Sequence, residues 1–408
     1  MKRWVPAGLF ALIGLLVAMT AAAGLGMSGG ATQPGLYGVT WQGSLGLVRV
    51  DPDTLRPRSG RRVPIAGEPL AWSFAPDRSR LVLGSAARGT ELRLIDLRAM
   101  ELLGNVKVTR RGSTVATAWA GPRRVLAVVV TPGCCGAGDT IVAGIDAVRR
   151  HVVWRQRLGG SLQAGERFGG RLFLVLGPRG RSLGPSRLVR VGPQGRVRSV
   201  ELPEIRSGSE PAGSVTETWS PGLAVDPAGA RAFVVQAQAP VTEVDLRTFQ
   251  VRPHSLGPWA KAADDVVGPQ RDALWLGRGL LAVTGSDSEK APAGLTLVDT
   301  RRWRARTIDA RATDAALVSG TLFASSLLYD ARSQRVRGSG LTGFSIDGRR
   351  RFHLYGRQAV TGVQPVGSKA LVGTRSGIAL IDARTGQQLR RFRRFAMSLI
   401  GGDAPILD

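Results

Sequence analysis

A pattern that recurs eight times constrains the fold of this chain more than any other feature. Each unit has an apolar run, a short turn that usually contains aspartate, and a second run that ends in basic or apolar residues. Examples are LGLVRVDPDTLRPRSGRRVPI from residue 45, ELRLIDLRAMELLGNVKV from 91 and GIALIDARTGQQLRRF from 377. The turn markers lie 37 to 54 residues apart: Asp51, Asp96, Asp146, Gly192, Asp245, Asp299, Ser345 and Asp382. This spacing is typical of four-stranded propeller blades of about 40 to 50 residues.

Two further strand-like runs precede each of these hairpins. PLAWSFAPDRSRLVLGSA (69–86) and GLAVDPAGARAFVVQAQ (222–238) each contain two apolar runs joined by a turn of Pro, Asp, Gly or Ala. Such links are typical of tight turns between strands. We therefore predict an all-β fold, a single β-propeller of four-stranded blades over residues 35–408. Eight blades are favoured, with seven as the second choice.

The two ends of the repeat array indicate how the ring closes. The first unit begins at GLYGVTW (35–41) and lacks an innermost strand, whereas AMSLIG (396–401) follows the last unit. We expect this C-terminal segment to join the first blade, because closure removes two exposed sheet edges. The repeated aspartates have a structural role in the same scheme. At the first position of a tight turn, a carboxylate accepts backbone N–H groups and fixes the hairpin.

These segments resemble the repeats of YVTN-type and quinoprotein-like (PQQ-repeat-like) β-propellers. IDARTGQQL (381–389) is similar to the tryptophan-docking repeat through Asp382, Thr385 and Gly386, but Arg390 stands where the family has tryptophan. IDAVRRHVVW (145–154) has Asp146 and Trp154 but lacks Thr-Gly. The likeness spans nearly the whole chain, and the individual repeats are degenerate. It implies the propeller fold and leaves the function open.

The N-terminal residues are typical of an export signal. Lys2 and Arg3 precede an apolar run from Leu9 to Ala18, and Ala21–Ala23 fit a small-residue cleavage site. The apolar stretch from Trp4 to Met27 is also long enough for an uncleaved anchor. We expect residues 1–26 to be a signal peptide or N-terminal membrane anchor and 27–34 to be a linker. The body of the protein is then secreted or otherwise extracytoplasmic.

The chain is strongly basic, with a formal net charge of +26, and only five of its 56 basic residues are lysine. A GC-rich genome, in which arginine codons are frequent, explains this composition without any binding partner. Alternatively, an arginine-rich outer rim attracts an anionic polymer or lipid headgroups of the envelope. Nucleic acid is not expected, because the protein is exported and shows neither a recognition helix nor an aromatic single-strand groove. The membrane contact that we expect is the N-terminal anchor.

In a propeller, the links between second and third strands share one face with the links between blades. We expect a ligand site on this face, near the central channel, because functional residues concentrate on loops held by a rigid scaffold. The strand links contribute Cys134, Cys135, Arg179, Arg181, Asp287, Arg332 and Arg335. The inter-blade segments 205–219 and 256–267 contribute Trp219, Trp259, Asp264 and Asp265. Blade packing is an equally good interpretation of the aromatic residues.

The adjacent pair Cys134–Cys135 lies in the glycine-rich loop TPGCCGAGD (131–139). Export favours pairing, and each cysteine has only its neighbour within the chain. A vicinal disulfide is strained, because adjacent Cα atoms lie about 3.8 Å apart. Gly133, Gly136 and Gly138 give the backbone the freedom that such a ring requires. A disulfide that stiffens the loop, free or intermolecular thiols, and a redox or cofactor role all remain open.

Catalytic and metal-binding residues are sparse in the sequence. His151, His254 and His353 are scattered, and we interpret them as solvated surface residues. No metal site is expected, since zinc needs three or four converging ligands. Some quinoprotein dehydrogenases that resemble this chain carry a vicinal cysteine ring beside a PQQ cofactor and hold calcium through carboxylate and Asn ligands. This chain has a single Asn, Asn105.

We therefore predict an exported, non-enzymatic, monomeric scaffold without cofactors, which binds an unidentified protein or an anionic envelope polymer. The alternative is a degenerate quinoprotein-type dehydrogenase, with PQQ and calcium, or a propeller hydrolase. Either enzyme would place its site at the mouth of the central channel.

Overall fold

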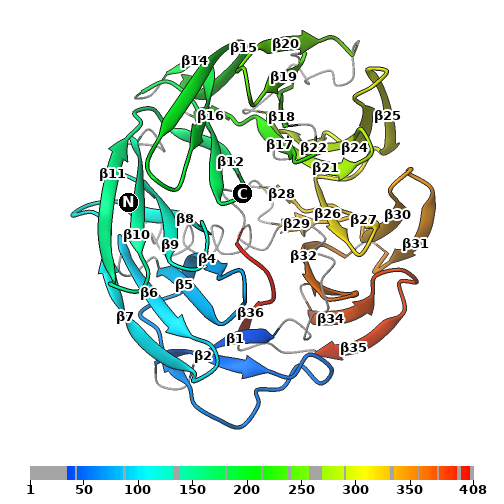
Figure 1. The fold of residues 1–408 in the computed structure, drawn as a ribbon. Helices are drawn as coiled ribbons and strands as arrows, with labels where there is room; N and C mark the ends of the chain where they lie inside the picture. The colour runs from blue at the N-terminus through cyan, green and yellow to red at the C-terminus, as the bar shows by residue number, and fades with distance from the viewer. Residues whose placement is uncertain are drawn as a thin grey trace, which may run out of the picture.

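The chain folds into a ring of eight antiparallel sheets that follow one another in chain order (Figure 1). The computed structural model describes residues 35–41, 44–85, 89–131, 138–179, 182–212, 215–228, 230–237, 240–256, 269–288, 291–330, 335–356, 358–374, 376–392 and 397–404. Each sheet is one blade, so the predicted all-β propeller and its favoured count of eight blades are confirmed. Within these ranges, no helix has the length and apolar character needed to cross a membrane.

The first four blades have the following strands, named from the axis of the ring outward. Blade 1 contains β36 (Met397–Ile400), β1 (Leu36–Trp41), β2 (Leu45–Val50) and β3 (Val63–Pro64). Blade 2 contains β4 (Pro69–Phe74), β5 (Arg80–Ser85), β6 (Glu91–Asp96) and β7 (Glu101–Lys107). Blade 3 contains β8 (Ser113–Trp119), β9 (Arg124–Val130), β10 (Thr140–Asp146) and β11 (His151–Arg157). Blade 4 contains β12 (Leu162–Phe168), β13 (Arg171–Leu176), β14 (Leu183–Val191) and β15 (Val197–Ala212), and β16 (Val215–Trp219) pairs with β15.

The remaining four blades repeat this arrangement. Blade 5 contains β17 (Gly222–Asp226), β18 (Arg231–Val235), β19 (Val241–Asp245) and β20 (Val251–His254). Blade 6 contains β21 (Gln270–Gly277), β22 (Leu280–Ser288), β24 (Leu295–Asp299) and β25 (Arg304–Asp309), with β23 (Ala291–Pro292) beside β22. Blade 7 contains β26 (Asp314–Val318), β27 (Thr321–Ser325), β30 (Leu341–Ser345) and β31 (Arg350–Leu354), and its inserted hairpin is β28 (Leu328–Asp330) with β29 (Arg335–Arg337). Blade 8 contains β32 (Val360–Val366), β33 (Lys369–Thr374), β34 (Gly377–Asp382) and β35 (Gln388–Phe392).

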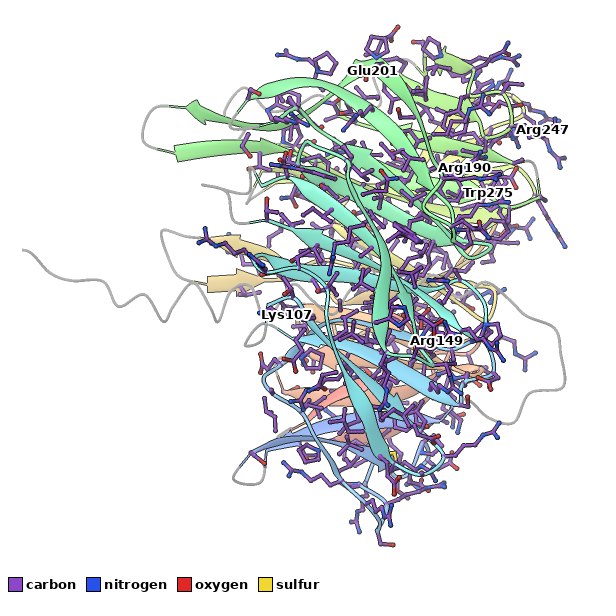
Figure 2. All side chains as sticks on the ribbon, turned by 60° about the vertical axis from the view of Figure 1, so that its left-hand side comes forward. Lys107, Arg149, Arg190, Glu201, Arg247 and Trp275 are labelled. Atoms are coloured by element: carbon purple, nitrogen blue, oxygen red, sulfur yellow. The ribbon has the colours of Figure 1, made fainter. Side chains whose placement is uncertain are left out.

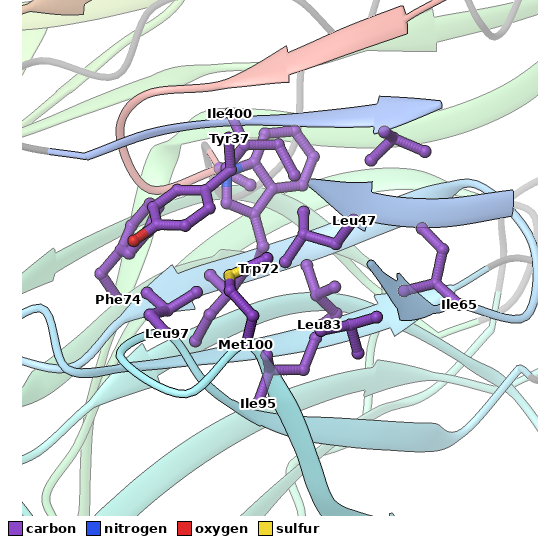
Figure 3. Packing of buried hydrophobic residues seen from close by; sticks show 14 residues of the cluster. Tyr37, Leu47, Ile65, Trp72, Phe74, Leu83, Ile95, Leu97, Met100 and Ile400 are labelled. Atoms are coloured by element: carbon purple, nitrogen blue, oxygen red, sulfur yellow. The ribbon is translucent and has the colours of Figure 1, made fainter. Parts of the chain in front are cut away.

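The ring closes through β36, as the sequence predicts. β36 pairs antiparallel with β1 and supplies the innermost strand of blade 1, with Tyr37 opposite Ile400 and Thr40 opposite Met397. Ile400 also packs in the buried cluster that contains Tyr37 and Trp72 (Figure 3). The last described strand of the chain is therefore held by backbone pairing and by apolar burial.

The hydrophobic core lies in the seams between neighbouring blades. Among the described residues, eight clusters of buried side chains can be distinguished, and each one joins two adjacent blades. The middle strands are buried on both sides; all five residues of β27, for example, are buried. The outer strands alternate or face solvent, as β11 does. Each blade is thus stabilised mainly by its two neighbours.

The turns between the third and fourth strands lie on one side of the ring, which we call the turn face. Figure 2 shows Arg149 and Arg247 at this side, whereas two hairpins project from the opposite side, the loop-rich face. These hairpins are β28–β29 and the end of β15 with β16, in which Gly208 pairs with Trp219 and Ala212 with Val215. Much of segment 205–219, expected as an inter-blade link, therefore forms strand structure.

In two seams an aromatic ring of one blade lies over a glycine of the next blade. The Trp154 indole of blade 3 donates through Nε1 to Pro193 O of blade 4 at 3.1 Å and lies over Gly195. Phe352 of blade 7 lies against Gly386 of blade 8 in the same way, so that a Cβ at Gly386 would be only 2.5 Å from the ring. Both glycines have positive φ, 80° and 74°. Glycine is suited to these turns because it tolerates this backbone and leaves room for the ring.

The other seams connect neighbouring turns with different side chains. Arginines donate to backbone carbonyls of the next blade's turn, as Arg49 does to Leu97 and Arg98, Arg198 to Arg247 and Thr248, and Arg306 to Asp347. His254 of blade 5 stacks on Trp303 of blade 6, with ring centroids 3.4 Å apart. Lys369 of blade 8 binds Asp53 of blade 1 at 2.6 Å. The seams are therefore connected by several kinds of contact, made from different strands of the blades.

Candidate functional site

The structure places only some of the residues predicted for a ligand site. Seven of them lie outside the described residues: Cys134, Cys135, Arg181, Trp259, Asp264, Asp265 and Arg332. Arg335 begins β29, but its side chain is not among those described. The proposed Cys134–Cys135 disulfide therefore stays a prediction.

Arg179 lies beside the stem of the cysteine loop. Two hydrogen bonds between Thr131 and Asp139 close the stem. The Thr131 N–H donates to Asp139 O at 3.0 Å, and the Asp139 N–H donates to the Thr131 hydroxyl at 2.9 Å. The Asp139 carboxylate accepts hydrogen bonds from Arg157, and Arg179 Nε lies 3.7 Å away. Asp139 is largely buried, whereas Arg157 and Arg179 are largely exposed. The stem is thus fixed, with two exposed guanidinium groups at its base.

Asp287 and Trp219 have surroundings that favour structural roles. Asp287 forms a buried ion pair with Arg271, whose Nη1 also donates to Gln270 O and Ser286 O. The two side chains satisfy each other within blade 6. Trp219 ends β16, and its indole N–H is buried without a hydrogen-bond partner among the described residues. The structure does not bring Arg179, Asp287 and Trp219 into one described cluster.

The aspartates of the turn face fix their turns as predicted. In six blades the carboxylate Oδ1 accepts the backbone N–H groups two and three residues later, at 2.7–3.2 Å: Asp51, Asp96, Asp146, Asp245, Asp299 and Asp382. These hydrogen bonds lower the pKa of Asp51 to about 2 and hold the pKa of Asp382 below its usual value. The six carboxylates are thus each bound to the backbone of their own turn.

Each of the eight turns also carries at least one exposed arginine, and we call these side chains the tip arginines. They are Arg56, Arg98, Arg149, Arg196, Arg247, Arg301, Arg302, Arg349 and Arg384. Because the turns recur once per blade, the tip arginines follow the whole circumference of the turn face (Figures 1 and 2). Exposed guanidinium groups thus recur in all eight turns among the described residues, beside the turn aspartates, and we take this ring of arginines as the candidate site.

The innermost strands carry carboxyl groups that the sequence analysis did not single out. Burial raises the pKa of Glu166 on β12 to about 7 and that of Asp314 on β26 to about 7. Desolvation raises the pKa of Asp272 on β21 to about 6, although this residue is exposed at the surface. All three carboxyl groups lie on the first strand of their blade, next to the axis of the ring. Their positions in the sequence repeats were the signal that could have identified them. Acidic groups thus lie toward the axis and arginines at the turn tips.

The histidine interpretation is wrong for one of the three residues. His254 Nε2 lies 3.0 Å from Glu243 Oε2, and its ring stacks on Trp303, so it belongs to the seam between blades 5 and 6. His151 and His353 are exposed, as expected. His353 also forms a hydrogen bond with Thr342 at 3.0 Å.

The described residues do not fit the calcium and quinone of the resembled dehydrogenases. Asn105, the single Asn of the chain, is exposed on β7, the outer strand of blade 2. Within the described ranges, no three His, Cys, Asp or Glu side chains gather closely enough to hold a metal ion. Carboxylate and amide oxygens are the ligands that calcium requires. We therefore derive no reaction step through such a cofactor.

Comparisons with known proteins support the fold and leave the function open. No protein-family model matches the chain, and no curated protein matches its sequence. Among solved structures, the dihydro-heme d1 dehydrogenase NirN in complex with DHE is similar over 94% of this chain and 78% of its own, with 14% identity and a TM-score of 0.56. The Dos1 propeller is similar over 80% of this chain and 85% of its own, with 9% identity and a TM-score of 0.52. The structure of BamB from Moraxella catarrhalis is similar over 86% of this chain and 91% of its own, with 12% identity and a TM-score of 0.45.

Proposed function

We propose that this protein is an exported, non-enzymatic β-propeller that acts as a binding scaffold in the cell envelope and attaches to an anionic polymer through its turn face. One observation carries the proposal: the third-to-fourth-strand turn of every blade presents at least one exposed arginine. In six of these turns the aspartate is occupied by backbone N–H groups, and in blade 7 Arg349 pairs with Asp347 at 3.3 Å. The other tip arginines are the side chains left to meet a partner.

The chemistry of the ring favours a long, repeating anion. A guanidinium group binds carboxylate, sulfate or phosphate through two parallel hydrogen bonds. Each exposed contact is weak on its own, but contacts linked on one rigid scaffold add through their high effective concentration. A ring of like charges also raises the association rate with a polyanion, and salt reduces both effects.

Export supports an envelope partner rather than an intracellular one. Residues 1–26 have the charge and hydropathy pattern of a signal peptide or anchor, although they lie outside the described residues. Attachment through the turn face leaves the loop-rich face, with its two projecting hairpins, turned away from the polymer (Figure 2). A protein partner would then meet the scaffold on that side.

Retention of the protein on immobilised heparin, a sulfated and carboxylated polymer, tests the attachment of the turn face to a polyanion. The test variant combines Arg149→Gln, Arg247→Gln, Arg302→Gln and Arg384→Gln, four tip arginines on four blades. The matched control combines Lys107→Gln, Arg110→Gln, Arg111→Gln and Arg206→Gln, four exposed basic residues outside the turns. Both variants lose the same formal charge.

We expect the wild type to be retained at low salt and released by moderate salt. The test variant should elute at a clearly lower salt concentration, and the control should elute with the wild type. Equal shifts in the two variants would show that net charge alone determines retention. Absence of retention at low salt would refute the attachment.

The enzymatic alternative is tested separately. Absorbance spectra of the purified protein, recorded after incubation with quinone and calcium, should show only the free cofactor under our proposal. A shifted and saturable quinone spectrum would instead favour the dehydrogenase.

A further inference from the structure

The C-terminal tail continues beyond the ring closure and lies against a second blade. After β36, residues 401–404 leave blade 1 and run toward the middle of the ring (Figure 1). Gly401 O accepts from Arg78 Nη2 at 2.8 Å, and Gly402 O accepts from the Trp72 indole at 2.8 Å. Ala404 N–H donates to Trp72 O at 3.0 Å. The tail thus pairs with β4, the innermost strand of blade 2, along an edge that no other described strand occupies.

The Asp403 side chain joins this tail to two blades. Its Oδ1 accepts the backbone N–H of Phe74 at 2.7 Å. Its Oδ2 lies 3.2 Å from Nη1 of Arg167, which is on β12 of blade 4. Arg78 is fixed nearby, with its guanidinium 4.2 Å above the Phe74 ring. One carboxylate therefore connects the tail with blades 2 and 4 across the inner end of blade 3.

The residues around Asp403 have more donor capacity than the tail uses. Arg78 Nε is a buried atom without a hydrogen-bond partner among the described residues, whereas the buried Arg167 Nη1 has the Asp403 carboxylate as its ion-pair partner. The Arg167 side chain is only 19% exposed, whereas the tip arginines are exposed to solvent. A backbone N–H together with a guanidinium group is a strong donor set for a carboxylate, and Arg78 adds a second positive charge nearby. Loss of the Asp403 carboxylate would leave the Phe74 N–H and Arg167 Nη1 buried without a partner, and another carboxylate would recover that free-energy cost.

We propose that Arg78, Arg167 and the backbone N–H of Phe74 form a carboxylate-binding site, which Asp403 occupies as a ligand supplied by the chain itself. An external carboxylate of an acidic peptide takes this position when the tail leaves. The site goes beyond the polymer attachment of the turn face, since it uses none of the tip arginines. Because Asp403 is tethered, the external ligand competes with a high local concentration of the internal one.

Chemical rescue of Asp403→Gly by acetate tests the proposal on the full chain. Asp403→Gly removes the carboxylate but keeps the tail and β36. We expect a lower melting temperature than in the wild type and a saturable recovery when acetate is added at constant ionic strength. Acetamide, which has the same shape without the charge, should give no recovery. The wild type should require at least about tenfold more acetate for any comparable effect, because its own carboxylate fills the site.

Three further variants keep the test decisive. Arg167→Gln combined with Asp403→Gly should abolish the recovery by acetate. Asp403→Asn, which keeps an acceptor for the Phe74 N–H and fills the same space, should not respond to acetate. The four-residue tip variant combined with Asp403→Gly should still be rescued, which separates this site from the polymer attachment. Equal effects of acetate and acetamide, or rescue that survives Arg167→Gln, would overturn the proposal.

Discussion

The seams between blades and the tips of the turns use the same residue type in opposite ways. At the seams, Arg49, Arg198 and Arg306 donate to backbone carbonyls of the neighbouring turn. At the tips, arginines such as Arg149 and Arg302 are exposed to solvent, and their side chains form no hydrogen bond with the other described residues. The comparison shows that an arginine-rich composition combines two populations, one that stabilises the ring and one that is available to a partner.

The closing seam should be the most sensitive part of the ring. Deletion of residues 396–408 removes β36, including the buried Leu399 and Ile400, and leaves the inner edge of β1 unpaired. We expect a loss of more than about 5 kcal/mol in the free energy of unfolding, since each buried aliphatic side chain contributes about 2–5 kcal/mol. Thermal unfolding followed by circular dichroism measures this. An unchanged melting curve would contradict closure by β36.

The aromatic seam between blades 3 and 4 should be next in size. Trp154→Ala removes a half-buried indole that packs over Gly195 and donates to Pro193. We expect a loss of about 3 kcal/mol. Trp154→Phe keeps the ring and loses the hydrogen bond, so about 1 kcal/mol should be lost. Chemical denaturation measures both, and equal losses in the two variants would argue against ring packing as the main contribution.

An arginine seam should contribute less than an aromatic one. Arg198→Ala removes hydrogen bonds to Arg247 O and Thr248 O and a cation–π contact with Phe249, whose ring lies 4.5 Å from the guanidinium. We expect a loss of about 1–2 kcal/mol. Arg196→Ala, in the adjacent turn and exposed, is the control and should change stability by less than about 0.5 kcal/mol. Identical losses would mean that the two populations of arginine cannot be distinguished by stability.

The turn aspartates should contribute least, and in a pH-dependent way. Asp382→Ala removes hydrogen bonds from the backbone N–H groups of Arg384 and Thr385, and we expect at most about 1 kcal/mol at pH 7 because the carboxylate is exposed. Since folding lowers the pKa of Asp382, this stabilisation is complete above the unfolded pKa of about 4 and disappears as the pH falls through the folded value. Wild type and variant should therefore converge in stability near pH 2. A difference that stays constant with pH would exclude the carboxylate.

The fold could be predicted because its signals are local and repeated. Aspartate turns such as Asp146 and Asp245 mark each blade, and the strand missing at GLYGVTW pointed to a C-terminal partner. The seam contacts could not be predicted, because Trp154, Arg198 and His254 fill similar positions with unrelated chemistry. The Asp403 contact with Arg167 joins residues more than 200 positions apart and follows no repeat. Long-range polar contacts of this kind need the three-dimensional structure.

The central claim is that the arginines of the turn tips, and not those of the seams, bind the polymer. The most direct test compares the salt concentrations at which a seam variant and a tip variant elute from heparin. Arg49→Gln, Arg198→Gln and Arg306→Gln should lower the melting temperature and leave elution close to that of the folded wild type. Arg149→Gln, Arg247→Gln and Arg302→Gln should leave the melting temperature nearly unchanged and move elution to lower salt. Earlier elution of the seam variant, or unchanged elution of the tip variant, would contradict the assignment of the turn tips as the polymer-binding surface.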